Sequence, residues 1–285
     1  MSELSKQETI RALLWLLDAG ADEAISETPV SRLGASRASL ASGSTERRPD
    51  RSLDTSSRPS SSQRVANPAV AEAVSEGRDQ TDLVGRALEA AAQCATLGEL
   101  KAALERYEGS QLKKQALNTV FADGNPSGRI LFIGEAPGRD EDRSGLPFVG
   151  VAGKLLDLML ASIGLDRTSA YIINVLPWRP PENRTPEPTE VAQCIPFLRR
   201  HIELAQPEIL VLLGAVAVRH VLGLAEGIMK YRGRWMEYRV GQKMIPVMPT
   251  LHPAYLLRQP GHKKLAWRDL QAVEKRLLTL GLRES

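Results

Sequence analysis

The apolar residues of this chain gather in short runs, and longer stretches of mixed polarity separate those runs. Runs of four or five mostly apolar residues are typical of strands buried on both faces of a sheet, and the stretches between them predict helices. The runs are Ile130–Ile133, Tyr171–Val175, Ile209–Leu213 and Met244–Met248, and the predicted helices are roughly Ala152–Ile163, Thr189–Gln206 and Ala215–Leu222.

Strands that alternate with helices predict an α/β fold, with three layers (α/β/α) around a central four-stranded parallel sheet. Ligands of such sheets bind beyond the carboxyl ends of the strands. Polar or glycine-rich segments follow three of the four runs directly. The functional site is therefore expected at that edge.

The pattern also divides the chain. Residues 1–30 predict a helical segment with an apolar band around Trp15, and residues 31–66 are rich in serine and arginine with few large apolar side chains. Because such a composition buries too little apolar surface to fold, residues 31–66 are expected to be a disordered linker. Residues 67–285 are then a single globular, catalytic domain.

Composition narrows the class of protein. The chain has 285 residues, a formal net charge of +3 and two cysteines, which excludes a disulfide framework. The apolar run Ala12–Leu17 is far shorter than a membrane span and is not a convincing signal peptide. The expected location is the cytoplasm, at the nucleoid. A pI near 8.9 permits a nucleic-acid partner without arguing for one.

The segment after the first run is Gly134-Glu-Ala-Pro-Gly138, followed by Asp140, Glu141 and Asp142 and then by Gly145-Leu-Pro-Phe-Val-Gly150. It lacks the lysine of a nucleotide P-loop. Two interpretations of the acidic residues stay open. They could bind a hard cation, or they could complement the dipole at a helix N-terminus.

Two further segments carry candidate chemistry. Asn174 ends the second run and is followed by a proline-rich loop that contains Asn183. A buried amide offers a donor and an acceptor to a base edge, or it bonds to backbone. His252 opens a segment that continues to Arg258, in which two leucines form either a wedge for a DNA duplex or the first turn of a helix.

Taken in order, these motifs resemble the uracil-DNA glycosylase superfamily and, within it, the family 4 enzymes. The resemblance rests on GEAPGxxED with PFVG, on Asn174 with RPPxNRTP, on LGAVA after the third run, and on HPAYLLR, and it spans roughly residues 107–270. It implies a monofunctional glycosylase that flips uracil out of single- or double-stranded DNA and hydrolyses its glycosidic bond. Lys154 is the one lysine near a position suited to a Schiff base.

The resemblance also implies roles for individual residues. Glu135 is implied to act near the attacking water, His252 to stabilise the uracil anion at O2, and Asn183 to belong to the active-site loop. The implied uracil-binding residues are Ala136, Glu141, Phe148, which stacks on the base, and Asn174, which reads its edge. The implied DNA-binding residues are Tyr255, Leu256, Leu257 and Arg258.

The sequence departs from the family at the iron–sulfur cluster, which four cysteines usually hold. The matching positions are Tyr107, Ser110, Trp178 and Cys194. Because one thiol cannot replace four, no cofactor is expected, and Trp178 is expected to fill the vacated space together with Tyr107.

Two alternatives to the enzyme are an inactive reader of uracil-containing DNA and a metal-dependent α/β phosphate-binding enzyme. Retention of Glu135, Asn174 and His252 argues against the reader. The expected assembly is a monomer without membrane association. Residues 1–30 are candidates either to dock on the core or to recruit a protein partner.

Overall fold

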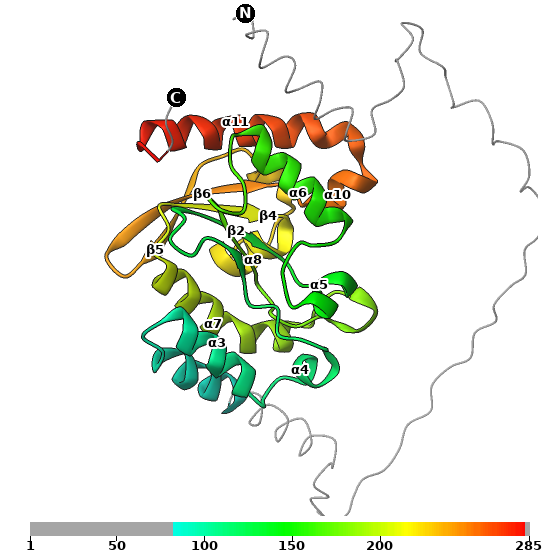
Figure 1. The fold of residues 1–285 in the computed structure, drawn as a ribbon, viewed down its shortest axis with the longest axis vertical. Coiled ribbons are helices and arrows are strands. Elements are labelled where there is room, and N and C mark those ends of the chain that lie inside the picture. Colours follow the sequence, from blue (N-terminus) through cyan, green and yellow to red (C-terminus); the bar gives the residue numbers. More distant parts are fainter. Residues whose placement is uncertain (1–81, 283–285) are drawn as a thin grey trace, which may run out of the picture.

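A six-stranded sheet forms the centre of the computed structural model, which describes residues 82–282 (Figure 1). Its strand order is β1-β3-β2-β4-β6-β5, and the four inner strands are parallel. The strands are β1 (Asp123–Gly124), β2 (Ile130–Gly134), β3 (Tyr171–Asn174), β4 (Ile209–Leu213), β5 (Met236–Val240) and β6 (Lys243–Thr250). The predicted α/β class and the four parallel strands are confirmed.

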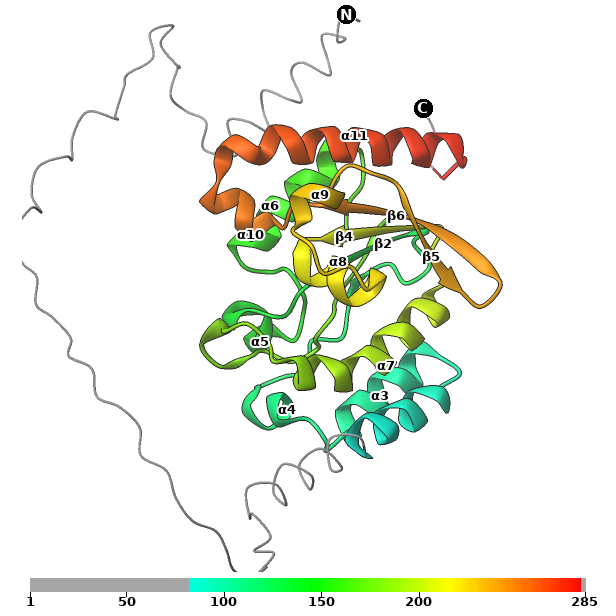
Figure 2. The same ribbon diagram turned by 180° about the vertical axis from the view of Figure 1, so that it is seen from behind.

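Helices cover both faces of the sheet, as the view from behind also shows (Figure 2). Alternate side chains of β2 point to opposite faces: Phe132 packs with α6 and α11, whereas Ile133 packs in the cluster that contains α3, α7 and α8. The helices are α3 (Leu97–Arg106), α4 (Gln111–Gln115), α5 (Arg139–Ser144), α6 (Val151–Ser162), α7 (Pro188–Ala205), α8 (Ala215–Leu222), α9 (Ile228–Tyr231), α10 (Pro253–Arg258) and α11 (Lys263–Thr279), with short 3-10 turns η1 (Pro181–Asn183) and η2 (Pro260–His262).

The predicted helices agree closely with α6, α7 and α8. The sequence missed both antiparallel edge strands, β1 and β5. Strand β5 alternates half-buried with exposed side chains, so it contains no apolar run. Strand β1 has two residues and leaves no pattern.

A helical layer precedes the sheet in the chain. Residues 82–92 are helical, and Ala87 and Ala91 pack in the same core as Leu100 of α3 and Phe197 of α7. The expectations for residues 1–30 and 31–66, and the start of the globular domain at residue 67, lie outside the described residues. Within residues 82–282, every helix is too short or too polar to cross a membrane.

Candidate active site

A cavity of about 380 Å³ opens at the carboxyl edge of the parallel strands. Its walls come from the segments after β2, β3 and β6 and from the loop before α6. It gathers eight of the residues singled out in the sequence: Glu135, Ala136, Glu141, Phe148, Asn174, Asn183, His252 and Arg258. Sequence reasoning missed other residues of its wall, among them Pro180 and Arg184.

Asn174 lies on the floor of the cavity at the end of β3. Its side chain is 8% exposed, and its Oδ1 is buried without a hydrogen-bond partner. A Cβ added to Gly134, its neighbour in the sheet, would lie 2.4 Å from this oxygen. Because a buried acceptor is rarely left unpaired, Asn174 is poised to accept a hydrogen bond from a ligand.

His252 is held as a neutral ring with a defined tautomer. Its Nδ1 accepts a hydrogen bond from the Ala254 backbone N–H at 3.1 Å, which caps α10. A ring nitrogen that accepts carries no proton, so the proton of the neutral ring resides on Nε2. Burial, together with the nearby Arg258 guanidinium, lowers the pKa of His252 to about 4. At neutral pH His252 is therefore an uncharged hydrogen-bond donor.

Gly214, the N-cap of α8, has no side chain and so makes room for His252. Its φ is +92°, and an added Cβ would lie 3.0 Å from the Cβ of His252. Gly214 belongs to the LGAVA motif, but the sequence alone did not indicate what this glycine does. Gly214 is thus a positioning residue for the His252 ring.

Replacing Gly214 by alanine is expected to slow catalysis more than its effect on stability explains. Alanine at this φ is strained by roughly 1–3 kcal/mol, and its methyl group also displaces His252. Gly223→Ala is the matched control, because Gly223 has a φ of +71° but nothing within 4 Å of the added Cβ. Thermal unfolding of both variants, and their rates of base release from uracil-containing DNA as the resemblance implies, check this. Equal loss of activity in the two variants would contradict the positioning role.

Glu135 faces the same cavity from the loop after β2. Burial raises the pKa of its carboxyl group, and the positive charge of Arg258 opposes that increase. Arg258 is exposed, yet it lines the cavity, and its positive charge affects the pKa of both Glu135 and His252. The site thus combines a partly desolvated carboxylate with a neutral imidazole.

Glu141 connects the two loops that frame the cavity. Its Oε2 accepts from Gly138 N at 3.0 Å, and its Oε1 accepts from Val149 N and Gly150 N at 2.9 Å each. The next residue, Asp142, accepts from Leu117 N at 2.8 Å. Both carboxylates are occupied by backbone donors. The Glu141 contacts lie at the N-termini of α5 and α6, which agrees with the helix-terminus interpretation for Glu141, whereas Asp142 binds the segment that follows α4.

Phe148 forms one wall of the cavity, with its ring centroid 5.6 Å from that of His252. A Cβ on Gly134 would lie 2.5 Å from the Phe148 ring, so this ring rests directly on the glycine backbone. Phe148 has a φ of +55°, a left-handed conformation that is strained by roughly 1–3 kcal/mol for a residue with a side chain. The surrounding structure must therefore hold it in place.

Asn183 lines the cavity but is exposed to solvent. Its Oδ1 accepts a hydrogen bond from Arg179 Nε at 2.7 Å. Asn183 and its neighbour Glu182 have positive φ values of 56° and 53°, although neither is a glycine. Arg179 thus orients the Asn183 amide, a contact that the sequence did not reveal.

The structure separates the residues of the HPAYLLR segment. Leu256, expected at the DNA interface, is fully buried in the core beside α11 and has no exposed surface to present to DNA. Leu257 is 40% exposed and remains available as a wedge. Tyr255 is half-buried, and its hydroxyl group lies 2.7 Å from Nδ1 of His262, which leaves the ring braced against η2. The segment is therefore a short helix with an exposed leucine and arginine at its end.

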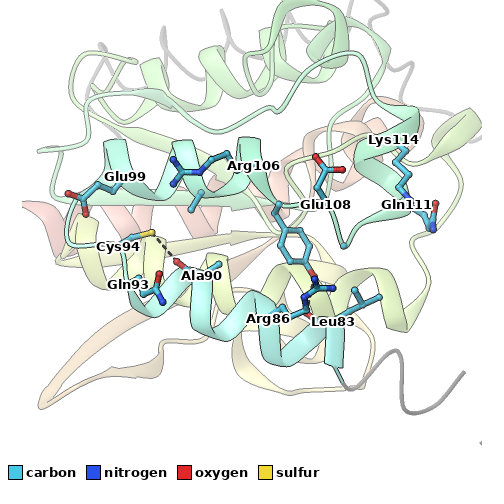
Figure 3. A pocket seen from close by; sticks show the side chains of 13 residues that line it. Leu83, Arg86, Ala90, Gln93, Cys94, Glu99, Arg106, Glu108, Gln111 and Lys114 are labelled. Atoms are coloured by element: carbon cyan, nitrogen blue, oxygen red, sulfur yellow. Dashed lines mark hydrogen bonds between the residues drawn. The ribbon is translucent and has the colours of Figure 1, made fainter. Parts of the chain in front are cut away.

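A larger hollow, of about 690 Å³, lies away from this site between helix 82–92 and α3 (Figure 3). Its wall mixes cations such as Arg86 and Arg106 with anions such as Glu99, and the Cys94 thiol donates to the Ala90 carbonyl oxygen at 3.2 Å. Among the described residues of its wall, no histidine lies beside a carboxylate as His252 and Glu135 share the smaller cavity. Size alone does not make it the functional site.

The four positions that match the family's cluster cysteines are buried together. The ring of Tyr107 stacks on that of Trp178 with centroids 6.5 Å apart and meets that of Phe197 at 5.3 Å. The hydroxyl of Tyr107 donates to the Leu83 carbonyl oxygen at 2.8 Å, and the Trp178 indole N–H donates to Thr119. This donor set of phenol, hydroxyl, indole and one thiol does not fit an iron–sulfur cluster, which thiolates hold.

Comparison with known proteins identifies the family of this chain. The family model of the uracil DNA glycosylase superfamily matches residues 121–271. The chain therefore belongs to the uracil-DNA glycosylase superfamily, and within it to the type-4 enzymes. Three type-4 uracil-DNA glycosylases are similar to it. That of Sulfurisphaera tokodaii is 40% identical over 57% of this chain and 76% of its own length. Those of Thermotoga maritima and Archaeoglobus fulgidus are 46% and 45% identical, over 54% and 52% of this chain and 80% and 77% of theirs.

Proposed function

We propose that this protein is a monofunctional uracil-DNA glycosylase, which excises uracil from DNA by hydrolysis in base excision repair. The single observation that carries the proposal is the cavity, which places Glu135, Asn174 and His252 around one space lined by the Phe148 ring. A base inside a duplex cannot reach such a cavity, so the nucleotide must be extruded into it. The three relatives compared above are type-4 uracil-DNA glycosylases, which supports the proposal.

Recognition of uracil follows from Asn174. Uracil presents an N3–H donor beside a carbonyl acceptor, and an amide side chain presents the complementary acceptor and donor. The unpartnered Oδ1 of Asn174 supports this pairing. Cytosine has no N3–H, so it would leave this buried acceptor unpaired, and such a mismatch is a strong basis for discrimination.

Hydrolysis places charge at two points, and the cavity has a group suited to each. As the bond between C1′ and N1 breaks, the electron pair stays on the base, and Nε2–H of His252 donates to the resulting anion. Water adds to C1′ of the cationic sugar and gives up one proton, which balances the proton that the uracil anion takes up to leave as neutral uracil. The Glu135 carboxylate orients the water and stabilises the positive charge. The products are free uracil and an abasic site.

The test is to incubate the protein with single- and double-stranded oligonucleotides that contain one uracil, and to measure released base and abasic sites. Equal amounts of both products are expected, with no adduct after borohydride treatment. A borohydride-trapped adduct would overturn the monofunctional mechanism by indicating a lysine nucleophile such as Lys154. Tight binding without released uracil would instead indicate an inactive reader.

We further propose that the domain folds without a cluster, because aromatic packing fills the position that the cluster would take. Tyr107 and Trp178 are 8% and 1% exposed, and both polar tips have hydrogen-bond partners. Burial of two such rings stabilises this region by several kcal/mol at about 25 cal/mol per Å². No catalytic step involves this region.

The protein is accordingly expected to purify without stoichiometric iron, even from cells grown with added iron. Its melting temperature should be unchanged by a chelator, because no metal binding is linked to folding. Iron analysis and thermal unfolding with and without the chelator check this. A brown protein with four irons per chain would contradict it.

Deletion of residues 1–66 is expected to leave the excision rate within about twofold, because mutations without contact to a site have small effects. Within residues 82–282, every residue that lines the cavity lies between Glu135 and Arg258. We propose that residues 1–30 are a docking or recruiting segment joined by a linker, and that the enzyme acts as a monomer at the nucleoid. Loss of activity after the deletion would contradict this division.

A further inference from the structure

The Phe148 backbone must be held from outside the cavity. Its ring is 5% exposed and lies against Gly134 and His252, while its backbone adopts a positive φ. A residue with a side chain leaves this conformation unless its neighbours prevent it. Glu141 accepts from the two backbone N–H groups that follow Phe148, and further contacts fix the carbonyl oxygens of the same loop.

Arg167, in the loop between α6 and β3, supplies these contacts. Its Nη2 donates to the carbonyl oxygen of Phe148, and its Nη1 donates to that of Pro147 at 3.1 Å. Two consecutive carbonyl groups are thus fixed by one planar guanidinium, which is a geometry that a lysine cannot reproduce. The side chain is 24% exposed and does not line the cavity.

Arg167 is itself fixed by two carboxylates from different elements. Its Nη1 also pairs with Asp123 of β1, and its Nε pairs with Asp157 of α6 at 2.8 Å. The remaining oxygen of Asp123 accepts from Gly124 N at 2.8 Å. The guanidinium therefore has little freedom, and the loop is tied to both the sheet edge and a helix.

The packing of α6 leaves the loop carbonyl no room on the other side. A Cβ added to Gly153 would lie 1.7 Å from the Phe148 carbonyl oxygen. That oxygen is therefore packed against the glycine on one side and bound by Arg167 on another. Rotation of the peptide would have to break the hydrogen bond.

We propose that Arg167, held by Asp123 and Asp157, is a positioning residue that fixes the Phe148 backbone and thereby places its ring to stack on the extruded base. The stacking role rests on the proposed function, whereas the placement of the ring does not. Because Arg167 does not line the cavity, it acts on the site through the loop that carries Phe148.

The first test is a double-mutant cycle on uracil excision. Arg167→Met is expected to lower the single-turnover rate at saturating DNA by about 10- to 100-fold, since small misplacements of a binding group have effects of this size. The DNA concentration at half-saturation should change little. In the Phe148→Ala background the same change should cost less than about threefold, because coupled residues are not additive. Equal losses in both backgrounds would overturn the proposal.

The matched control is Arg200→Met. Like Arg167, Arg200 binds a backbone carbonyl and a carboxylate. Its Nε donates to the Cys94 carbonyl oxygen at 2.8 Å, and it pairs with Glu203 at 2.9 Å. However, Arg200 lies on α7 and does not line the cavity. Its loss should lower the melting temperature about as much as the loss of Arg167, with excision within about twofold. An equal loss of excision in both variants would overturn the proposal by making the effect general.

A second readout does not depend on activity. The chain has four phenylalanines, so full-length protein labelled with 4-fluorophenylalanine gives four fluorine resonances, and Phe148→Leu assigns one of them. In Arg167→Met the Phe148 resonance should shift or broaden, and in Arg200→Met it should not. An unchanged resonance would overturn the proposal, whether or not the protein releases uracil. A wild-type protein that releases no uracil would instead contradict only the proposed function.

Arg167→Lys covers the case in which Arg167→Met fails to fold. It keeps the positive charge between Asp123 and Asp157 but loses the planar pair of donors. An intermediate loss of rate with a displaced Phe148 resonance is expected. Wild-type behaviour in both readouts would overturn the proposal.

Discussion

Replacing Glu135 by glutamine is expected to slow uracil excision by roughly 10²–10⁴-fold, which is the usual range for loss of a positioned acid–base group. The amide keeps the shape of the side chain but lacks the charge that orients water and stabilises the cationic sugar. Single-turnover measurements at saturating DNA report this step directly. Binding of the DNA should change much less than the rate.

The pH profile makes this prediction sharper. Burial raises the pKa of Glu135, so the carboxylate gains a proton at a higher pH than an exposed glutamate would. Wild-type activity should therefore fall, as the pH is lowered, already above the usual pKa of a glutamate. The glutamine variant should lack this acid limb. Glu182→Gln, at an exposed carboxylate outside the cavity wall, should leave the rate within about twofold. An acid limb that persists in the Glu135 variant would contradict the role of Glu135.

Replacing His252 by alanine is expected to slow excision by about 10²–10³-fold, the usual effect of removing one donor to a developing anion. The same change also removes the Nδ1 acceptor that caps α10, which by itself lowers the free energy of unfolding by about 1 kcal/mol. His252→Asn separates the two effects, because asparagine is a good N-cap but does not carry an imidazole donor. Rates and thermal unfolding of the two variants should show equal loss of activity and unequal loss of stability.

The neutral state of His252 gives a further check. Since the pKa of His252 is lowered to about 4, its protonation lies below the working range, and His252 should contribute no titration between pH 5 and 8. Proton-detected nuclear magnetic resonance of the ring follows this titration. A His252 that titrates near pH 6.5 would contradict a neutral donor.

The sequence predicted the parts of the fold that depend on burial. Strands β2 and β4 are buried at every position, so their apolar runs were unmistakable. Strand β5 was missed because its face toward solvent interrupts the run, and β1 was missed because it has only two residues. The formation of these edge strands depends on pairing with a neighbouring strand rather than on an apolar pattern of their own.

The site shows the same division. Glu135, Asn174 and His252 follow strands and carry polar chemistry, so sequence motifs indicated them. The contacts that position the site are long-range: Gly214 acts through the space beside His252, and Arg167 acts through backbone carbonyls of another loop. Such contacts have no local pattern.

The fate of the leucines and of the acidic segment illustrates this limit. Leu256 and Leu257 are adjacent and identical, yet helix geometry buries the first and exposes the second. Glu141 resembled a metal ligand, but its oxygens bind three backbone N–H groups across two loops. Neither outcome follows from residue type, because both depend on the direction in which a side chain points.

The most direct measurement is alkali cleavage of an oligonucleotide that contains one uracil, after incubation with the protein in EDTA. The account predicts robust cleavage at the uracil, none at cytosine or thymine in the same sequence, and loss of cleavage in the Glu135→Gln and His252→Asn variants. Cleavage that requires added metal, or that is undiminished in both variants, would contradict it.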